Sequence, residues 1–375
     1  KMEALQWIKR ISQWVWGPWM LVLLVGTGVF LTIRLKAYPW RNLGFALRAV
    51  FQRTKGRRGS GDISPFQSLM TALAATIGTG NLVGVATAMV LGGPGALVWM
   101  WISALFGLST KFAESVLAVR YREKQPNGEM AGGPMYAMKN GFQRKKLGKA
   151  LAFLFSLFAA AAAFGIGNMT QANSIAEALY ASTGAEAYLV GLCLLVLSGC
   201  VLLGGIRSIG RVCGVVVPVM AVGYFAAGLA AIASRAAYLP AGLAEIIRMA
   251  FSAQSAAGGV GGTIVAHMGQ AVQWGVARGV FSNEAGLGSS VMANSAAGCT
   301  PVEQGMWGIM EVAVDTLFMC TLTALAILCS GAYDLEAYAE AGTRGLLETL
   351  PNGAALTADA FRTALGPWGG VFLAV

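Results

Sequence analysis

Apolar residues run in stretches of about 20 along most of the chain, the length that an α-helix needs to cross a bilayer. Eight stretches are predicted as membrane spans, and a ninth begins at Trp368. The eight cover residues 13–33, 66–91, 95–119, 151–176, 186–204, 209–233, 261–297 and 305–331. Residues 240–256 alternate apolar side chains with Glu245 and Arg248, which predicts an amphipathic helix at the membrane interface. The pattern therefore predicts an all-α polytopic membrane protein.

The composition excludes the main soluble classes. Hydrophobic residues make up 56% of the 375 residues and charged residues only 12%, about half of the ~25% usual in soluble domains. This excludes a secreted disulfide scaffold, a disordered chain, a cytosolic enzyme and a nucleic-acid binder. Six scattered cysteines without a CxxC pair, and a single histidine, favour no zinc site. We predict neither enzymatic activity nor a cofactor.

The net charge of +10 is distributed unevenly between the predicted loops. Segments 34–65, 120–149 and 204–211 are basic, whereas the link between the fourth and fifth spans carries only Glu177 and Glu186 as charged residues. Cytoplasmic loops of membrane proteins carry the excess of Lys and Arg. We therefore predict a multi-pass protein of the plasma membrane (the inner membrane of a bacterial or archaeal cell), with its N-terminus outside.

Two predicted spans contain glycine runs that interrupt a simple helix. The second span holds Ile77-Gly78-Thr79-Gly80-Asn81, and the seventh holds Gly279 to Gly288 with Ser282, Asn283 and Glu284 inside the run. Isolated glycines in membrane helices usually serve close packing. Non-helical backbone at membrane depth is tolerated where it lines a cavity, and paired interrupted spans mark transporter binding sites. Polar side chains inside both runs favour the binding site.

The interrupted spans suggest a division into two similar units. The five spans from 66 to 233 form one unit, and the seventh span opens a second. We predict an N-terminal peripheral helix with a basic loop (1–62), a first five-helix repeat (63–235), and an amphipathic segment with a truncated second repeat (236–375). A second unit of equal length would extend beyond residue 375. We therefore expect roughly three C-terminal core helices to be missing from this chain, and no transport by the chain alone.

Five motifs together are highly specific. They are Gly78–Ala88 (GTGNLVGVATA), Gly92–Ala96 (GGPGA) with the nearby Trp99–Trp101 (WMW), Gly132–Tyr136 (GGPMY), Phe281–Ser289 (FSNEAGLGS) and Val314–Thr316 (VDT). With them, the chain resembles the alanine or glycine:cation symporter family over nearly its whole length. The resemblance implies a LeuT-type fold of inverted five-helix repeats with an extra N-terminal helix. It also implies sodium-coupled import of alanine or glycine by alternating access. We expect a monomer; a proton-coupled transporter or a cation channel of the same architecture stays open.

An amino-acid substrate needs partners for its carboxylate and its ammonium. Helix N-termini attract anions, so we expect the carboxylate over the amides of Thr79, Gly80 and Asn81. The second break frees carbonyls near Phe281, Ser282 and Asn283, which suit the ammonium or sodium. The resemblance implies that Phe281 walls the pocket and that Gly286 keeps it open. It also makes the fourth span a core helix, so that Gln171 becomes a candidate substrate contact.

A sodium ion needs about five or six oxygen ligands. The resemblance implies a site made by the Thr76 carbonyl, the Asn81 side chain and Ser282, with Asp315 or Thr316 from the eighth span. An unpaired carboxylate at the position of Asp315, in mid-span, would cost at least ~2.5 kcal/mol. A bound cation would offset that cost. Protonation of Asp315, or its pairing with a neighbouring span, is the open alternative.

Four other ionisable side chains lie in the spans. Arg278 and Glu284 flank the second break, where they form a buried ion pair or hydrogen-bonded scaffold, or else contact the substrate. We favour the scaffold for Arg278 and leave Glu284 open. His267 is interpreted as a packing residue rather than a proton carrier. Lys111 and Glu114 have the spacing of a local i,i+3 pair.

Overall fold

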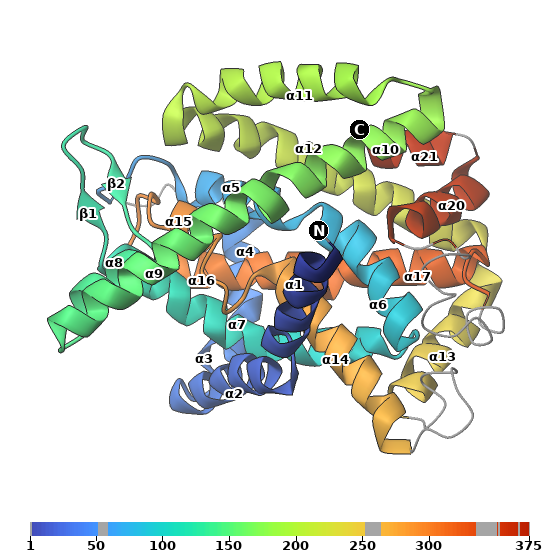
Figure 1. The fold of residues 1–375 in the computed structure, drawn as a ribbon, viewed down its shortest axis with the longest axis horizontal. Helices are drawn as coiled ribbons and strands as arrows, with labels where there is room; N and C mark the ends of the chain where they lie inside the picture. The colour runs from blue at the N-terminus through green and yellow to red at the C-terminus, as the bar shows by residue number, and fades with distance from the viewer. Residues whose placement is uncertain are drawn as a thin grey trace.

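Helices make up most of the described structure (Figure 1). The computed structural model describes residues 2–51, 59–251, 264–334, 351, 353–366 and 368–374. The first half contains α1 (Met2–Val15), α2 (Pro18–Arg34), α3 (Tyr38–Arg41), α4 (Leu43–Phe51), α5 (Pro65–Thr76), η1 (Gly80–Gly84), α6 (Val85–Gly92), α7 (Ala96–Arg120), β1 (Glu123–Lys124), β2 (Met130–Ala131), α8 (Pro134–Gly141), α9 (Lys145–Phe164), η2 (Gly165–Met169) and α10 (Thr170–Thr183). The second half contains α11 (Ala187–Leu202), α12 (Gly205–Ser234), η3 (Ala236–Tyr238), α13 (Leu239–Phe251), α14 (Ile264–Asn283), α15 (Val291–Asn294), α16 (Pro301–Val312), η4 (Ala313–Cys320), α17 (Thr321–Ser330), α20 (Gly353–Leu365) and α21 (Trp368–Ala374).

Several of the predicted spans are helices long and apolar enough to cross a membrane. In the described part of the chain, four helices meet this criterion: Ala96–Arg120, Lys145–Tyr180, Gly205–Ser234 and Pro301–Ser330. The pair formed by α5 and the helix over η1 and α6 is bent by 46° and counts as a fifth. The helices α2 and α11 are apolar but shorter, with 17 and 16 residues. The all-α, multi-span prediction is thus confirmed in its coarse form.

The first predicted span starts later than expected. Residues 13–15 belong to α1, and α2 begins at Pro18 after the extended Gly17. Proline is favoured in the first helical turn because it lacks the N–H that would have no partner there. In the segment expected to be only a basic loop, α3 and α4 form, and α4 packs on α16. The predicted interfacial helix corresponds to α13, and residues 252–256 lie outside the described residues.

The seventh predicted span is helical only in its first part. Its helix, α14, ends at Asn283, and only the four residues of α15 are helical in the part that follows. Glu284, Gly286 and Gly288 all have positive φ angles (55°, 96° and 74°), which a right-handed helix does not allow. A bent or broken helix followed by a long helix therefore occurs twice, first in α5 to α7 and again in α14 to α17. The proposed domain boundaries stay a prediction.

Close contacts at glycines hold α7 against α14 and α16. A Cβ atom at Gly275 of α14 would overlap the Ala96 carbonyl oxygen of α7, and one at Gly279 would overlap the Ser103 hydroxyl. Across the other interface, a Cβ at Gly308 of α16 would overlap the hydroxyl of Ser115. Small residues at helix interfaces let backbones approach closely in membranes, where packing drives association. The three helices thus form the frame around both breaks.

The three basic segments lie on one side of the molecule. Asp62 accepts a hydrogen bond from the Met130 N–H (2.6 Å) and pairs with Arg207 (3.2 Å), so all three segments meet there. Ile63 also forms a parallel bridge with Ala297, and the Gly59 N–H donates to the Gly298 carbonyl (2.9 Å). The charge pattern therefore predicted correctly that these loops share a side. That this side faces the cytoplasm stays a prediction.

Candidate functional site

The first break lies directly beside the second broken helix. After α5 ends at Thr76, the Gly78 N–H donates to Asn81 Oδ1 (3.0 Å) rather than to a carbonyl of the preceding turn. The next helix starts at Gly80, which approaches α14 so closely that a Cβ there would lie 3.0 Å from Ser282 Cα. N–H groups in the first turn of a helix lack intrahelical partners. The N–H groups of residues 79–81 therefore lie at the start of a helix, and an anion site there stays a prediction.

The second break frees two of the three carbonyls that were predicted there. The Ala285 N–H donates to Asn283 Oδ1 (2.9 Å), and the Gly286 N–H donates to Glu114 Oε1 (3.1 Å). In a continuing helix these two N–H groups would bond to the carbonyls of Phe281 and Ser282. Because side chains take the donors, both carbonyls are left out of the helical ladder.

A buried polar cluster connects the two breaks to the helix Pro301–Ser330. Asn81 Nδ2 donates to Asp315 Oδ1 (2.7 Å) and lies 3.3 Å from Ser282 Oγ. Asn283 Nδ2 donates to Thr316 Oγ1 (3.0 Å), which in turn donates to Asp315 Oδ2 (2.8 Å). All five side chains are at most 1% exposed. Four of the five predicted sodium ligands are thus brought together.

Asp315 is buried with neutral partners only. Both of its carboxylate oxygens accept hydrogen bonds, from Asn81 and from Thr316. None of the ion pairs formed by the described residues involves Asp315. A buried carboxylate requires a compensating cation or a proton. Asp315 therefore pairs with a neighbouring span through a hydrogen bond to Asn81. Its negative charge still requires a cation or a proton.

The remaining predicted site residues are divided between this cluster and its surroundings. Thr76 is buried at the end of α5. Gln171 of α10 points at the first break, because its amide oxygen would lie 3.9 Å from a Cβ at Gly78. Thr79 and Phe281 are half-buried. Gly286 is exposed, and a Cβ on it would meet Leu24 of α2 (2.7 Å), so the structure does not bring it into the cluster.

Arg278 and Glu284 do not form the ion pair considered from sequence. The Arg278 guanidinium lies over the rings of Trp274 (5.7 Å) and Phe281 (5.8 Å), and its Nε has no hydrogen-bond partner in the described structure. Glu284 instead accepts a hydrogen bond from Ser289 Oγ (2.5 Å). Arg278 is therefore held by two aromatic rings one helical turn from the break. The side chain of His267 lies outside the described part.

The partner of Lys111 was missed, and the local pair with Glu114 was wrong. Lys111 is fully buried and forms an ion pair with Glu311 of α16 (2.9 Å), while its ammonium also donates to Ser290 Oγ (2.5 Å). The two residues are 200 positions apart, so helical spacing carried no signal for this contact. The sequence signal for this contact was Glu311 itself, an ionisable residue inside the predicted eighth span.

Three π-helical segments occur among the described helices; two contain candidate site residues and the third lies close to one. Gly80 and Asn81 lie in η1, Asp315 and Thr316 lie in η4, and Gln171 follows η2 by two residues. Single-turn π segments are frequent at functional sites because the wider turn redirects side chains. Sequence composition gives no direct signal for such turns.

Two broken helices that meet at a buried polar cluster within a bundle of candidate membrane spans define a membrane transporter. The comparisons agree with this class. The model of the sodium:alanine symporter family matches residues 2–375. The chain is 46% identical to the sodium/alanine symporter AgcS of Methanococcus maripaludis, over all of this chain and 79% of that protein. It is 38% identical to the probable sodium/glutamine symporter GlnT of Bacillus subtilis, over 96% of this chain and 70% of that protein.

A third relative, the putative sodium/proton-dependent alanine carrier protein YrbD of Bacillus subtilis, is 34% identical over 98% of this chain and 73% of that protein. The family match and the high identity over the full chain establish its membership. The chain belongs to the sodium:alanine symporter family, and it is a sodium-coupled symporter of small amino acids rather than an enzyme.

Proposed function

We propose that this symporter imports alanine with sodium at the polar cluster between the two breaks. The convergence of Asn81, Ser282 and Asp315 is the observation that supports this assignment most directly. We favour alanine as the substrate because AgcS, which is 46% identical to this chain, is named a sodium/alanine symporter. Glutamine, named for another relative, is the competing substrate.

The substrate carboxylate would bind to the amides that follow the first break, at Thr79, Gly80 and Asn81. The ammonium would bind to the carbonyls freed at Phe281 and Ser282. Gln171 would contact the substrate from α10, and Phe281 would wall the pocket. The close approach of Gly80 to Ser282 leaves little volume, which favours a small side chain.

The sodium ion would be bound by the Thr76 carbonyl, the Asn81 side chain, Ser282, and Asp315 or Thr316. A cation here supplies the counterpart that the buried Asp315 carboxylate lacks. If the substrate carboxylate also ligates the ion, each ligand strengthens binding of the other by the same factor. This reciprocity is the core of the coupling mechanism.

The LeuT-type architecture is part of the proposal. A broken helix followed by a long helix occurs at both α5 to α7 and α14 to α17, as inverted repeats require. Rocking of one bundle against the other around the site would provide alternating access. The basic side would face the cytoplasm of the prokaryotic cell, with the N-terminus outside and the transporter working as a monomer.

The test is alanine affinity measured across a sodium titration at fixed ionic strength, in a full-length protein carrying this sequence. We expect sodium to lower the alanine dissociation constant by a factor of about 5 to 150, the usual range of coupling. Sodium-dependent counterflow of alanine in proteoliposomes would accompany it. A glutamine preference, a proton in place of sodium, or an unsaturable ohmic current would each contradict the proposal.

A further inference from the structure

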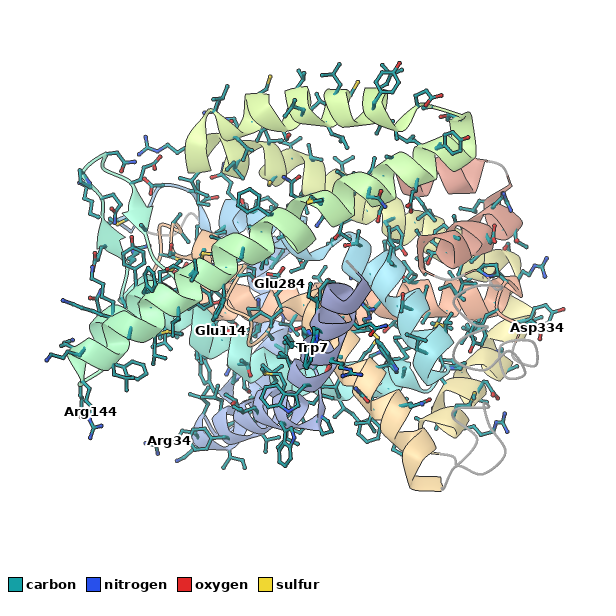
Figure 2. The ribbon with its side chains drawn as sticks, in the orientation of Figure 1. Trp7, Arg34, Glu114, Arg144, Glu284 and Asp334 are labelled. Atoms are coloured by element: carbon teal, nitrogen blue, oxygen red, sulfur yellow. The ribbon has the colours of Figure 1, made fainter. Side chains whose placement is uncertain are left out.

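A second group of ionisable side chains lies outside the polar cluster, two of them fully buried and two half-buried. It consists of Lys111 and Glu114 on α7, Glu311 on α16, and Glu284 directly after α14. Glu114 and Glu284 are both labelled near the middle of the molecule in Figure 2. Three carboxylates therefore surround one ammonium, and the proposed function uses none of them.

Two carboxylate oxygens in this group have no hydrogen-bond donor among the described residues. Glu311 is 0% exposed and its Oε1 pairs with Lys111 at 2.9 Å, whereas its Oε2 has no partner in the described part of the chain. Glu114 Oε1 accepts from the Gly286 N–H at 3.1 Å, and its buried Oε2 likewise has no partner among the residues that the structure describes. A buried acceptor left without a donor carries a desolvation penalty, which is larger when the group is charged.

We propose that Glu114 is a proton-binding site, and that the proton it carries weakens the contact holding the loop after the second break. A proton on Oε2 turns this oxygen into a hydroxyl donor. It also reduces the group from three negative charges against one positive charge to two against one. Both changes lower the free-energy cost of burying the ionised carboxylate.

Glu114 is the member of the group best placed to take the proton. Glu311 already has a charged partner, because its Oε1 forms the direct ion pair with Lys111. Glu284 accepts a hydrogen bond from Ser289 Oγ, so it already has a side-chain donor. Glu114 forms no ion pair within the described residues, and its one partner is a neutral backbone N–H.

The contact with Gly286 links the proton to the binding site. Gly286 lies three residues after Asn283, whose side chain contacts Thr316 of the polar cluster. An ionised carboxylate is a stronger hydrogen-bond acceptor than a neutral carboxyl group. Protonation therefore loosens the loop and with it the end of α14. Acidic pH should accordingly weaken alanine binding, a step that rests on the proposed function.

Two measurements on the full-length protein test the inference separately from alanine transport. The first is an infrared pH-difference spectrum without substrate, which detects the C=O stretch of a protonated carboxyl group. We expect a band that is absent in Glu114→Gln, kept but shifted in Glu114→Asp, and unchanged in Glu245→Gln. Glu245 is a matched control because it pairs with Arg248 on the interfacial α13. A band that survives in Glu114→Gln would overturn the inference, whether or not the protein binds alanine.

The second measurement is alanine affinity against pH at saturating sodium. Linkage to one proton limits the change to about tenfold per pH unit. The glutamine of Glu114→Gln keeps a carbonyl for the Gly286 N–H and cannot titrate, so its affinity should be flat with pH and should match the low-affinity acidic form. A purely structural role would lower affinity equally at every pH and keep the profile. That result would also reject the inference.

Discussion

Asn81 Nδ2 donates a 2.7 Å hydrogen bond to Asp315 Oδ1, across 234 positions of sequence. This contact connects the first broken span to the long helix that follows the second. A shift of either element would change the surroundings of a fully buried carboxylate. The site is therefore sensitive to relative movement of the two proposed repeats.

Replacing Asn81 with alanine should weaken sodium and alanine binding in parallel. The change removes a donor to Asp315 and an acceptor for the Gly78 N–H. We expect a loss of about tenfold in each affinity, within the usual range of coupling energies. Alanine affinity over a sodium titration measures it, with Asn173→Ala on the exposed face of α10 as control. Unchanged sodium dependence in Asn81→Ala would remove this residue from the sodium site.

Asp315→Asn separates a bound cation from a bound proton. If sodium balances the carboxylate, loss of the negative charge should weaken sodium binding tenfold or more, because a charged ligand is replaced by a neutral one. If Asp315 is protonated, asparagine closely mimics it and both affinities should stay near normal. Asp359→Asn, at a half-buried position where Asp359 pairs with the exposed Arg362, is the matched control.

A large side chain at Gly80 should abolish alanine binding and leave membrane insertion intact. Its Cβ would already lie 3.0 Å from Ser282 Oγ, in the space proposed for the substrate carboxylate. Binding is measured on the purified Gly80→Leu protein. Gly191→Leu on α11 provides the comparison, since a Cβ there meets nothing within 4 Å. Near-normal affinity in Gly80→Leu would place the substrate elsewhere.

Replacing either of two glycines of α14 with alanine should change the stability of the protein in opposite directions. Gly275→Ala forces a Cβ onto the Ala96 carbonyl oxygen, and overpacking of this kind costs about 1–3 kcal/mol. Gly269→Ala meets nothing within 4 Å and should gain up to about 1 kcal/mol from the better helix former. Thermal unfolding in detergent, followed by size-exclusion fluorescence, compares the two variants. Equal melting temperatures would contradict the tight packing of α14 on α7.

Single cysteines should report the orientation in the membrane. In a background without the exposed Cys193 and Cys200, a cysteine at Asn127 in the turn between β1 and β2 should react with an impermeant maleimide only after cell lysis. One at Glu186, between α10 and α11, should react in intact cells. The reverse pattern would place the basic side outside.

The sequence predicted the breaks better than the contacts around them. Glycine runs at 78–80 and 279–288 signalled both interruptions, because glycine weakens a helix wherever it stands. The meeting of Asn81 with Asp315 was expected only through family resemblance. The pairing of Lys111 with Glu311 was missed because spacing along one helix carries no information about a neighbouring helix. The π-helical turns gave no signal either, since one extra residue per turn leaves no compositional mark.

The backbone contacts on the basic side have a further consequence for the time course of transport. Gly59 bonds to Gly298, and Ile63 bridges Ala297, so the segments before the first break and after the second are connected there by main-chain hydrogen bonds. In the proposed alternating access, opening the site towards this side would separate these segments and expose their amides to solvent. The Gly298 N–H donates to the Ile63 carbonyl (2.9 Å), so its deuterium uptake would report this opening, and comparing uptake with and without alanine would show whether the substrate changes it.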